Sequence, residues 1–330
     1  MSRVITQLGK FAEKAGSQLD PLEFYHHVQL TFHDVESEYY DRLHEDMYVY
    51  LVDIFARLFS IITSGSNGLR ILDIGAGTGL VETFIAQKYS CHVQRIDIIE
   101  PNALMIRKLE AKNREWNLPV YCLNSYLEEA DIVDQYDVAI CSSVLHHIPN
   151  LSKFISILHN LVKPSGFILT MQDPRNEACS DTIAAQRRLL YDQHEASSKV
   201  RQHFVKRFVR KAFNLVGVEE FVLRRNPVAI AVNKTLKKNK VIKNNLTMAE
   251  IWAITDIHVP GQPGGMGEGI SLQQLKNCLP AYEEIDYITY NFFNQNYLNL
   301  PDSFKEIEKQ LLMENDSHGF LFASLFRRQN

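Results

Sequence analysis

Residues 71–80 of the chain read ILDIGAGTGL, an apolar run that ends in an acidic residue, a glycine turn and the start of a helix. Alternation of this kind predicts a buried strand, a tight turn and a helix. Glycines let the backbone approach a ligand closely, and a helix N-terminus offers free N–H groups. A dinucleotide-binding turn would read GxGxxG, but Leu80 occupies the place of its third glycine. The turn therefore disfavours a nicotinamide-dinucleotide site.

Apolar strand patterns and amphipathic helix patterns alternate on the carboxyl side of this turn. A helix is also expected before it, at 36–62, and two β-rich stretches at 284–293 and 319–326. Alternating strands and helices predict a parallel sheet with crossovers on both faces. The expected strands are 70–74, 92–99, 119–123, 137–141 and 167–171, and the expected helices are 79–89, 102–116, 127–133 and 151–162.

Further motifs follow in the same order along the chain. Glu100-Pro101-Asn102 ends the second strand, Asn124-Ser125 ends the third, and His146-His147 follows the fourth strand, which contains Cys141. The segment LVKPSG at 161–166 precedes the fifth strand. Together with the glycine turn, these motifs resemble those of the class I S-adenosylmethionine (SAM) methyltransferases.

The resemblance implies an α/β fold with a doubly wound, mostly parallel seven-stranded sheet of Rossmann-like methyltransferase type, and a helical cap inserted after strand 5. It covers residues 36–173 and the terminal strand pair. We therefore expect a SAM-binding core at 36–173 and 271–330, an N-terminal segment over the site at 1–35, and a cap that sets substrate specificity at 174–270.

SAM is the implied cofactor and S-adenosylhomocysteine the product. Glu100 is expected to accept hydrogen bonds from the ribose hydroxyls, in preference to Asp97, which lies inside its strand. Asn124 stands where the family usually has an aspartate against the adenine, and Tyr40 is expected to close over the methionine end. The expected cofactor-binding residues are Asp73, Gly75, Ala76, Gly77, Gly79, Glu100, Pro101, Asn102, Asn124, Ser125, Cys141 and Tyr40.

Three residues at the carboxyl edge of the sheet are candidates for catalysis. His146 and His147 follow the fourth strand and Asp173 ends the fifth. A hydroxyl acceptor needs a general base with a pKa near the working pH, and histidine suits that task. We expect His147 to be the base, with Asp173 orienting or polarising one of the two histidines. No metal is expected, because the histidines at 26, 27 and 33 lack an acidic partner set.

The composition of the 330-residue chain is that of a globular protein, with 45% hydrophobic and 22% charged residues. No apolar run is long enough to span a membrane, the N-terminus lacks the apolar core of a secretory signal, and five widely spaced cysteines indicate reduced thiols. These features predict a cytoplasmic location; they do not indicate an oligomeric state.

The net charge of −4 is unevenly distributed. Residues 187–243 contain 15 Lys/Arg and 4 Asp/Glu, a local charge of +11. This stretch is either a solvated cap helix or a docking face for an anionic partner. The glycine-dense loop 258–269 is either a lid, with His258 and Glu268 near the site, or a surface connection.

The sequence thus predicts a SAM-dependent methyltransferase that acts on a hydroxyl or amine of a small-molecule acceptor, with histidine and aspartate as base assistance. Two alternatives stay open. One is a SAM-binding protein without methyl transfer, either a regulatory module or a SAM-assisted cyclase. The other is a methyltransferase whose acceptor is a nucleic acid, a protein or a carrier-bound group docked on the basic stretch.

Overall fold

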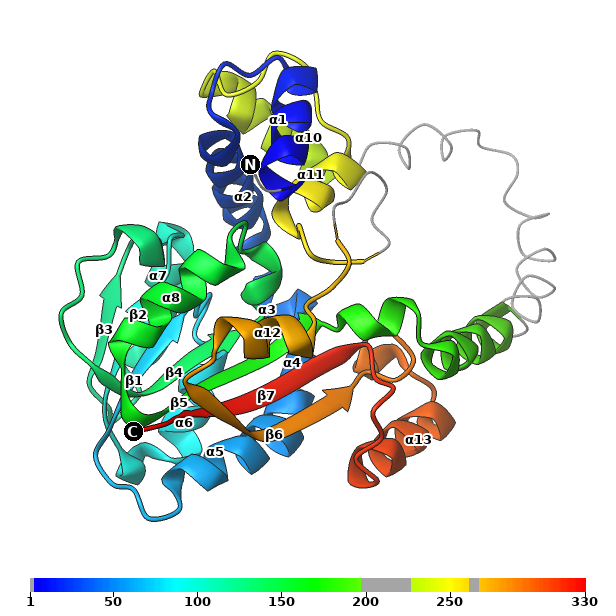
Figure 1. Ribbon diagram of the computed structural model, residues 1–330. Coiled ribbons are helices and arrows are strands. Elements are labelled where there is room, and N and C mark those ends of the chain that lie inside the picture. Colours follow the sequence, from blue (N-terminus) through cyan, green and yellow to red (C-terminus); the bar gives the residue numbers. More distant parts are fainter. Residues whose placement is uncertain (1–2, 197–226, 261–266) are drawn as a thin grey trace.

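A computed structural model describes residues 3–196, 227–260 and 267–330 of the chain (Figure 1). Seven strands form one sheet in the order β3-β2-β1-β4-β5-β7-β6, in which β7 runs antiparallel to both of its neighbours and the other pairs are parallel. The predicted mostly parallel seven-stranded α/β sheet is therefore confirmed. The strands are β1 (Leu69–Ile74), β2 (Val93–Ile99), β3 (Val120–Leu123), β4 (Tyr136–Ser142), β5 (Val162–Pro174), β6 (Tyr282–Tyr290) and β7 (Leu321–Arg328).

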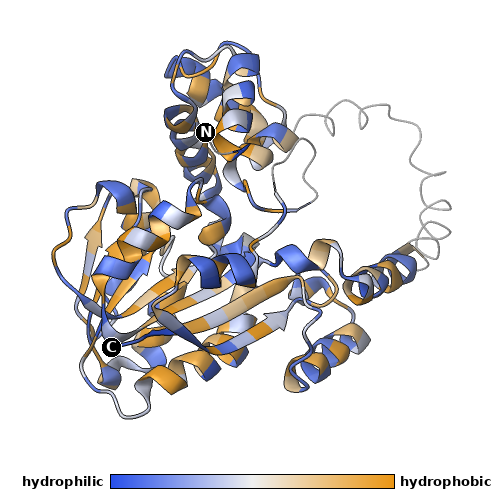
Figure 2. Ribbon diagram, viewed as in Figure 1, coloured by the Kyte–Doolittle hydropathy of each residue, from blue (hydrophilic) through white to orange (hydrophobic). Residues whose placement is uncertain are grey.

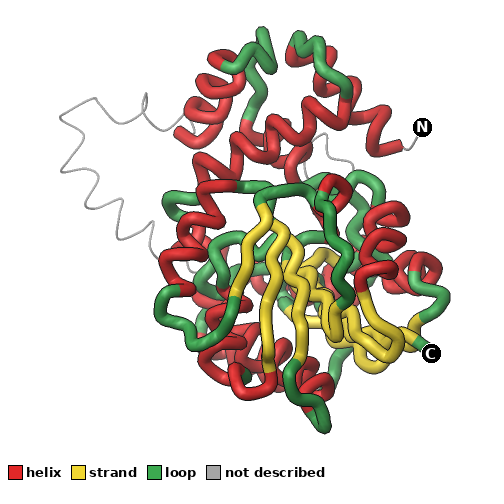
Figure 3. Tube along the Cα trace, turned by 90° about the vertical axis from the view of Figure 1, so that its left-hand side faces the viewer, coloured by secondary structure: helices red, strands yellow, loops and turns green. Residues whose placement is uncertain are grey.

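Helices cover both faces of this sheet, as Figure 3 shows from the side. Alternate residues of a strand point to opposite faces. Ile71 of β1 accordingly packs with helices α5, α6 and α7, whereas Leu72 packs with α8 and α12. The strands between the two layers are predominantly hydrophobic (Figure 2). The helices around the sheet are α5 (Ala56–Thr63), α6 (Leu80–Lys88), α7 (Ala103–Asn113), α8 (Leu151–Leu161), α12 (Leu272–Cys278) and α13 (Asp302–Met313).

Four further helices form a separate cluster over one end of the sheet (Figure 1). They are α1 (Arg3–Ala15), α2 (Pro21–Glu36), α10 (Pro227–Lys238) and α11 (Met248–Thr255). Leu8, Phe24, Val232 and Ile251 are fully buried in their shared core. The sequence treats 1–35 and 174–270 as separate units, but helices from both segments complete a single hydrophobic core. The domain boundaries themselves stay a prediction.

The first part of 174–270, before residue 197, packs against α13 and not within the helical cluster. Residues 182–196 are helical, and Tyr191 packs on Phe304 of α13. Arg187 donates two hydrogen bonds of 2.8 Å to the carboxylate of Asp316. One cation of the basic stretch 187–243 is thus already paired. Residues 197–226, which carry much of its charge, lie outside the described residues, so the anionic partner stays a prediction.

Two helix predictions are wrong. Residues 36–62 do not form one helix but α3 (Tyr40–Leu43), α4 (Met47–Tyr50), a π-helical turn (Leu51–Phe55) and α5. The chain turns after α2 because Tyr40 packs against Gly77 and Asp41 accepts a hydrogen bond from the Thr78 hydroxyl. These tertiary contacts override local helix propensity. Residues 127–133 form only a short 3₁₀ turn, Leu127–Glu129.

No described helix combines the length and apolar character that crossing a bilayer requires. All five cysteines are free thiols. The cytoplasmic location stays a prediction.

The start of α6 gives a prediction about stability. Gly79 has φ of +84°, and an added Cβ would lie 2.8 Å from Leu109 Cγ. Gly65 has φ of +88° with nothing within 4 Å. Gly65→Ala should lower the free energy of unfolding by about 1 kcal/mol through backbone strain alone. Gly79→Ala should cost about 1–3 kcal/mol more, because it also overpacks the α6–α7 contact. Urea unfolding of both variants measures the difference, and equal losses would contradict it.

Candidate functional site

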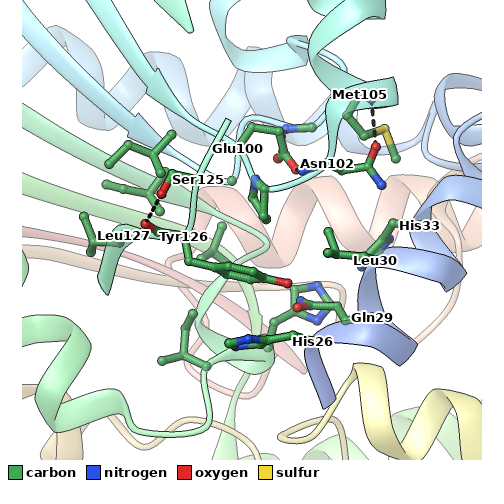
Figure 4. Close-up of a pocket in the computed structure, with 18 of the residues that line it drawn as sticks. His26, Gln29, Leu30, His33, Glu100, Asn102, Met105, Ser125, Tyr126 and Leu127 are labelled. Carbon is green, nitrogen blue, oxygen red and sulfur yellow. Dashed lines mark hydrogen bonds between the residues drawn. The ribbon is translucent and has the colours of Figure 1, made fainter. Parts of the chain in front are cut away.

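A cavity of about 870 Å³, including its open mouth, lies between the carboxyl edge of the sheet and helix α2. Figure 4 shows residues from the ends of β2 and β3 on one side and from α2 on the other. Its lining residues include Tyr25, His26, Gln29, Leu30, His33, Tyr40, Gly75, Gly77, Glu100, Pro101, Asn102, Met105, Ser125, Tyr126, Glu128, Ser143, Val144 and His147.

The glycine turn after β1 forms part of the cavity wall. Gly75 and Gly77 have φ of +72° and +57°, a conformation that favours glycine. A Cβ atom added to Gly75 would lie 2.7 Å from the Val144 side chain. A Cβ atom added to Gly77 would lie 3.6 Å from the ring of Tyr40, which covers this glycine. The turn therefore presents bare backbone to the cavity, as close approach of a ligand requires.

Glu100 and Asn102 are held by a dense set of hydrogen bonds at the end of β2. The Glu100 carboxylate accepts from the Gly77 N–H at 3.0 Å and from the Asn102 N–H at 2.8 Å. The Asn102 amide caps α7 and donates to Asp34 of α2 at 3.0 Å. Burial raises the pKa of Glu100, while the two backbone hydrogen bonds oppose that shift. Each carboxylate oxygen keeps lone pairs that a hydroxyl could use.

Asp73 lies beneath the turn rather than on the cavity surface. It is 1% exposed, and fully buried Glu82 of α6 is its neighbour. Burial raises the pKa of Asp73, and the nearby Glu82 carboxyl raises it further. Burial also raises the pKa of Glu82 to about 7. Asp73 thus stands close to the turn but does not line the cavity.

Four other predicted cofactor residues do not line the cavity. Asn124 is exposed and donates to the carbonyls of Glu100 and Pro101 at 3.0 and 2.8 Å, because its amide closes the β2–β3 edge instead of facing a ligand. Gly79 packs against Leu109 and Trp116. Cys141 is fully buried in the core between the sheet and α8. Ala76 packs against the opposite core, with α6. Asp97 accepts from Arg95 and Tyr136, as its place inside β2 suggests.

His147 lines the cavity and has a defined tautomer. Its Nδ1 lies 2.8 Å from the Thr255 carbonyl, which only accepts hydrogen bonds, so Nδ1 carries the proton. Among the described residues, none engages Nε2 in a hydrogen bond. Burial lowers the pKa of His147 well below the usual histidine range, and nearby His146 and His33 lower it further. The side chain is therefore a neutral imidazole with a free lone pair at neutral pH.

The acid–histidine pair forms with the other histidine. Asp173 is fully buried, and its Oδ1 accepts from the His146 backbone N–H at 3.0 Å and lies 2.8 Å from His146 Nδ1. His146 is buried and does not line the cavity. The two imidazole rings are 3.9 Å apart, centre to centre. Asp173 therefore orients His146, and the His146 ring in turn packs against the ring of His147.

A metal ion would find a suitable spacing here. One ligand atom from each of His146, His147 and Asp256 lies within 4.8 Å of the other two. Nδ1 of both histidines is already hydrogen bonded, however, to Asp173 and to Thr255. The expectation of a metal-free site stays a prediction.

Helix α2, which belongs to the N-terminal segment expected over the site, supplies the wall opposite the sheet edge, although the sequence did not show which of its side chains face the cavity. Tyr25 donates to the His147 carbonyl, and the His33 ring meets the His147 ring edge-on at 5.4 Å. Gln29 lies between them on the same helix face. Tyr126, on the opposite wall, stacks on His26 at 4.1 Å. Residues one turn apart on α2 share a face, but only a known partner could have shown which face mattered.

The remaining candidates from the sequence lie away from the cavity. His258 donates its backbone N–H to His146 O, and its Nε2 lies 3.0 Å from the Ile148 carbonyl. Glu268 pairs with Arg3 at 2.6 Å, and residues 261–266 of that loop lie outside the described residues. His27 does not line the cavity. A lid role for the loop stays a prediction.

Comparison with known proteins adds an independent view of this arrangement. Residues 43–220 match the family described as Methyltransferase domain. The chain is 33% identical over 111 residues to a ubiquinone biosynthesis O-methyltransferase of Rickettsia conorii (strain ATCC VR-613 / Malish 7), and 36% identical over 103 residues to its counterpart in Rickettsia bellii (strain OSU 85-389). These matches span 34% and 31% of this chain, and 37% and 41% of those proteins.

Two solved methyltransferase structures can also be compared with the chain. The plantazolicin methyltransferase BpumL in complex with S-adenosylhomocysteine has a TM-score of 0.48 at 11% identity, covering 98% of this chain and 99% of that one. The N-methyltransferase NodS from Bradyrhizobium japonicum WM9 has a TM-score of 0.41 at 10% identity, covering 83% and 85%.

The position of Glu100 predicts the effect of removing its charge. Glu100→Gln should weaken S-adenosylhomocysteine binding about tenfold or more, because hydrogen bonds to a charged group contribute about 1.5–3 kcal/mol. Isothermal titration calorimetry measures the affinity. Glu128→Gln is the matched control, since Glu128 also lines the cavity but is exposed. An unchanged affinity of the Glu100 variant would assign the ribose contact elsewhere.

Proposed function

Because the chain belongs to the SAM-dependent class I methyltransferases, we propose that it transfers a methyl group from SAM to a hydroxyl of a small molecule, with His147 as general base. The glycine turn and Glu100 hold the cofactor side of the cavity, and α2 forms the acceptor side. SAM, when bound, supplies the methyl group as an electrophile. The chain itself must position the acceptor, remove its proton and exclude water.

The state of His147 carries this proposal. Its Nδ1–H is held by the Thr255 carbonyl, which leaves Nε2 as a proton acceptor on a side chain that lines the cavity. The lowered pKa keeps the imidazole in its base form at neutral pH. Asp173 fixes the His146 ring, and this ring packs against the imidazole of His147 and restricts its rotation. A hydroxyl acceptor must lose its proton as the methyl group arrives, and the Nε2 lone pair offers a proton acceptor in the cavity.

The residues of the opposite wall fit SAM. Gly75 and Gly77 expose backbone, as close approach of a ligand requires, and Tyr40 covers Gly77. The buried Glu100 carboxylate has lone pairs left for the two ribose hydroxyls. Ser125 and Pro101 line the same side of the cavity, where we place the adenosine. These placements follow from the geometry of the wall and the family pattern together.

The hydroxyl is preferred over an amine on two grounds. Relatives of the chain are named as O-methyltransferases, and the proton acceptor is a neutral histidine. The position of this cavity between α2 and the sheet edge favours a small acceptor over a protein or nucleic acid. When the protein is incubated with methyl-tritiated SAM and a deproteinised cell extract, the label should therefore appear in a small molecule of that extract. Label found only in protein or nucleic acid, or no transfer by a chain that binds S-adenosylhomocysteine, would contradict the proposal.

The base role predicts a defined loss of turnover. His147→Gln should lower kcat by a factor of about 10² or more, which is the usual contribution of general-base catalysis. Binding of S-adenosylhomocysteine, measured by calorimetry, should be unchanged. His27→Gln is the control, since His27 lies on α2 outside the cavity. Full turnover of the His147 variant would remove the general-base assignment.

The lowered pKa of His147 predicts the pH dependence. The base form is lost only when pH falls through this lowered pKa, so the acid limb of kcat should lie below pH 6.5, the reference value for histidine. Steady-state release of S-adenosylhomocysteine at saturating acceptor, measured over about two pH units either side of that reference, gives the profile. Any residual activity of His147→Gln should lack this limb. An unchanged limb in the variant would assign it to another group.

A further inference from the structure

The acceptor wall contains a buried hydrogen-bonding atom that nothing in the protein satisfies. Gln29 is 9% exposed and lines the cavity, and its Oε1 has no partner among the described residues. The hydroxyl of Tyr126, on the facing wall, is also buried and unpartnered. An unsatisfied buried polar group destabilises a protein, so such groups in a cavity indicate hydrogen bonds that a ligand would complete. Figure 4 shows the Gln29 side chain and the Tyr126 ring extending toward each other across the cavity.

The position of Gln29 on its helix places it close to His147. Tyr25 lies one turn before Gln29 and donates to the His147 carbonyl, and His33 lies one turn after it and contacts the His147 ring. Residues four apart on a helix lie about 5–6 Å from each other on one face. Gln29 therefore sits between the two residues of α2 that touch His147. A group bound by its Oε1 lies beside the hydroxyl that His147 deprotonates.

The chemistry of the surrounding wall limits what that group can be. The lining residues that the structure describes include Glu100 and Glu128 but neither lysine nor arginine. Burial lowers the pKa of His26, so the ring stacked on Tyr126 is neutral. Burial lowers the pKa of the lining His33, but the Glu36 carboxylate 3.3 Å from its Nδ1 raises it overall, so the charge of this ring is already balanced within the protein. A carboxylate on the acceptor would therefore find no unpaired cation among the described lining residues. A flat, uncharged ring would pack against the stacked His26 and Tyr126 rings.

We infer that Gln29 is a specificity-determining residue that selects uncharged acceptors carrying a second hydrogen-bond donor beside the methylated hydroxyl. Its Oε1 accepts from that donor, and the Tyr126 hydroxyl completes the contact. The inference rests on the proposed function, because it assumes that the methylated hydroxyl lies at His147. A site built around an unsatisfied acceptor rejects analogues that lack the donor more strongly than an apolar site can.

The test compares two probes of nearly equal size. Catechol carries a hydroxyl beside the reacting hydroxyl, and 2-methylphenol carries a methyl group there. Their affinities for the complex of the protein with S-adenosylhomocysteine are measured by calorimetry. Catechol should bind about tenfold tighter or more. Gln29→Leu should abolish or reverse this preference, Gln29→Glu should retain it, and Tyr126→Phe should reduce it.

Two controls separate recognition from folding and from cofactor binding. Gln18→Leu makes the same side-chain change at an exposed position just before α2 and should leave the preference intact. The S-adenosylhomocysteine affinity should be the same in all variants, and none of them should have a lower thermal midpoint than the unmodified protein. If the unmodified protein binds both probes equally or neither, or if Gln29→Leu keeps the preference, the inference is overturned. Failure of the proposed function shows separately, as absent methyl transfer to any small molecule.

Discussion

The Glu100 carboxylate is the contact on which the arrangement of the site depends. It binds the backbone N–H of Gly77 in the turn after β1 and that of Asn102 at the start of α7. Asn102 in turn donates a hydrogen bond to Asp34 of α2, and this contact connects α2 to the edge of the sheet. Since a buried carboxylate is costly unless it is hydrogen bonded, these partners are needed wherever Glu100 is kept. One acid thereby joins the glycine-turn side of the cavity to its α2 side.

The two walls divide the chemical tasks between them. The turn and the ends of β2 and β3 present backbone and one carboxylate, which suit a cofactor with ribose hydroxyls. The acceptor wall instead presents His147, with its proton fixed by the Thr255 carbonyl, and Gln29, with an unsatisfied oxygen. His33, on the same helix face as Gln29, is paired with the Glu36 carboxylate. Two segments of the helical cluster contribute to that wall: α2, near the N-terminus, and the end of α11, which supplies the Thr255 carbonyl.

Much of the core could be read from local patterns. The strand–turn–helix order, the glycine turn, Glu100 at the end of β2 and the two histidines after β4 all depend on spacing within short stretches, and the structure has them at the sheet edge. Asn124 and Cys141 were predicted from the same short-range patterns, but they do not line the cavity. Their side chains are engaged by neighbours instead, through hydrogen bonds to the Glu100 and Pro101 carbonyls or through core packing. Motif position alone does not specify the direction of a side chain.

The sequence by itself determined the sheet, the glycine turn and the family, because periodicity and glycine placement act over a few residues. Tertiary structure decided the rest. Asp173 meets His146 rather than His147, the Thr255 carbonyl sets the tautomer of His147 across 108 positions of chain, and Gln29 enters the cavity only because α2 packs with α10 and α11. Each of these contacts joins segments far apart in sequence, where no local pattern records which side chains will meet.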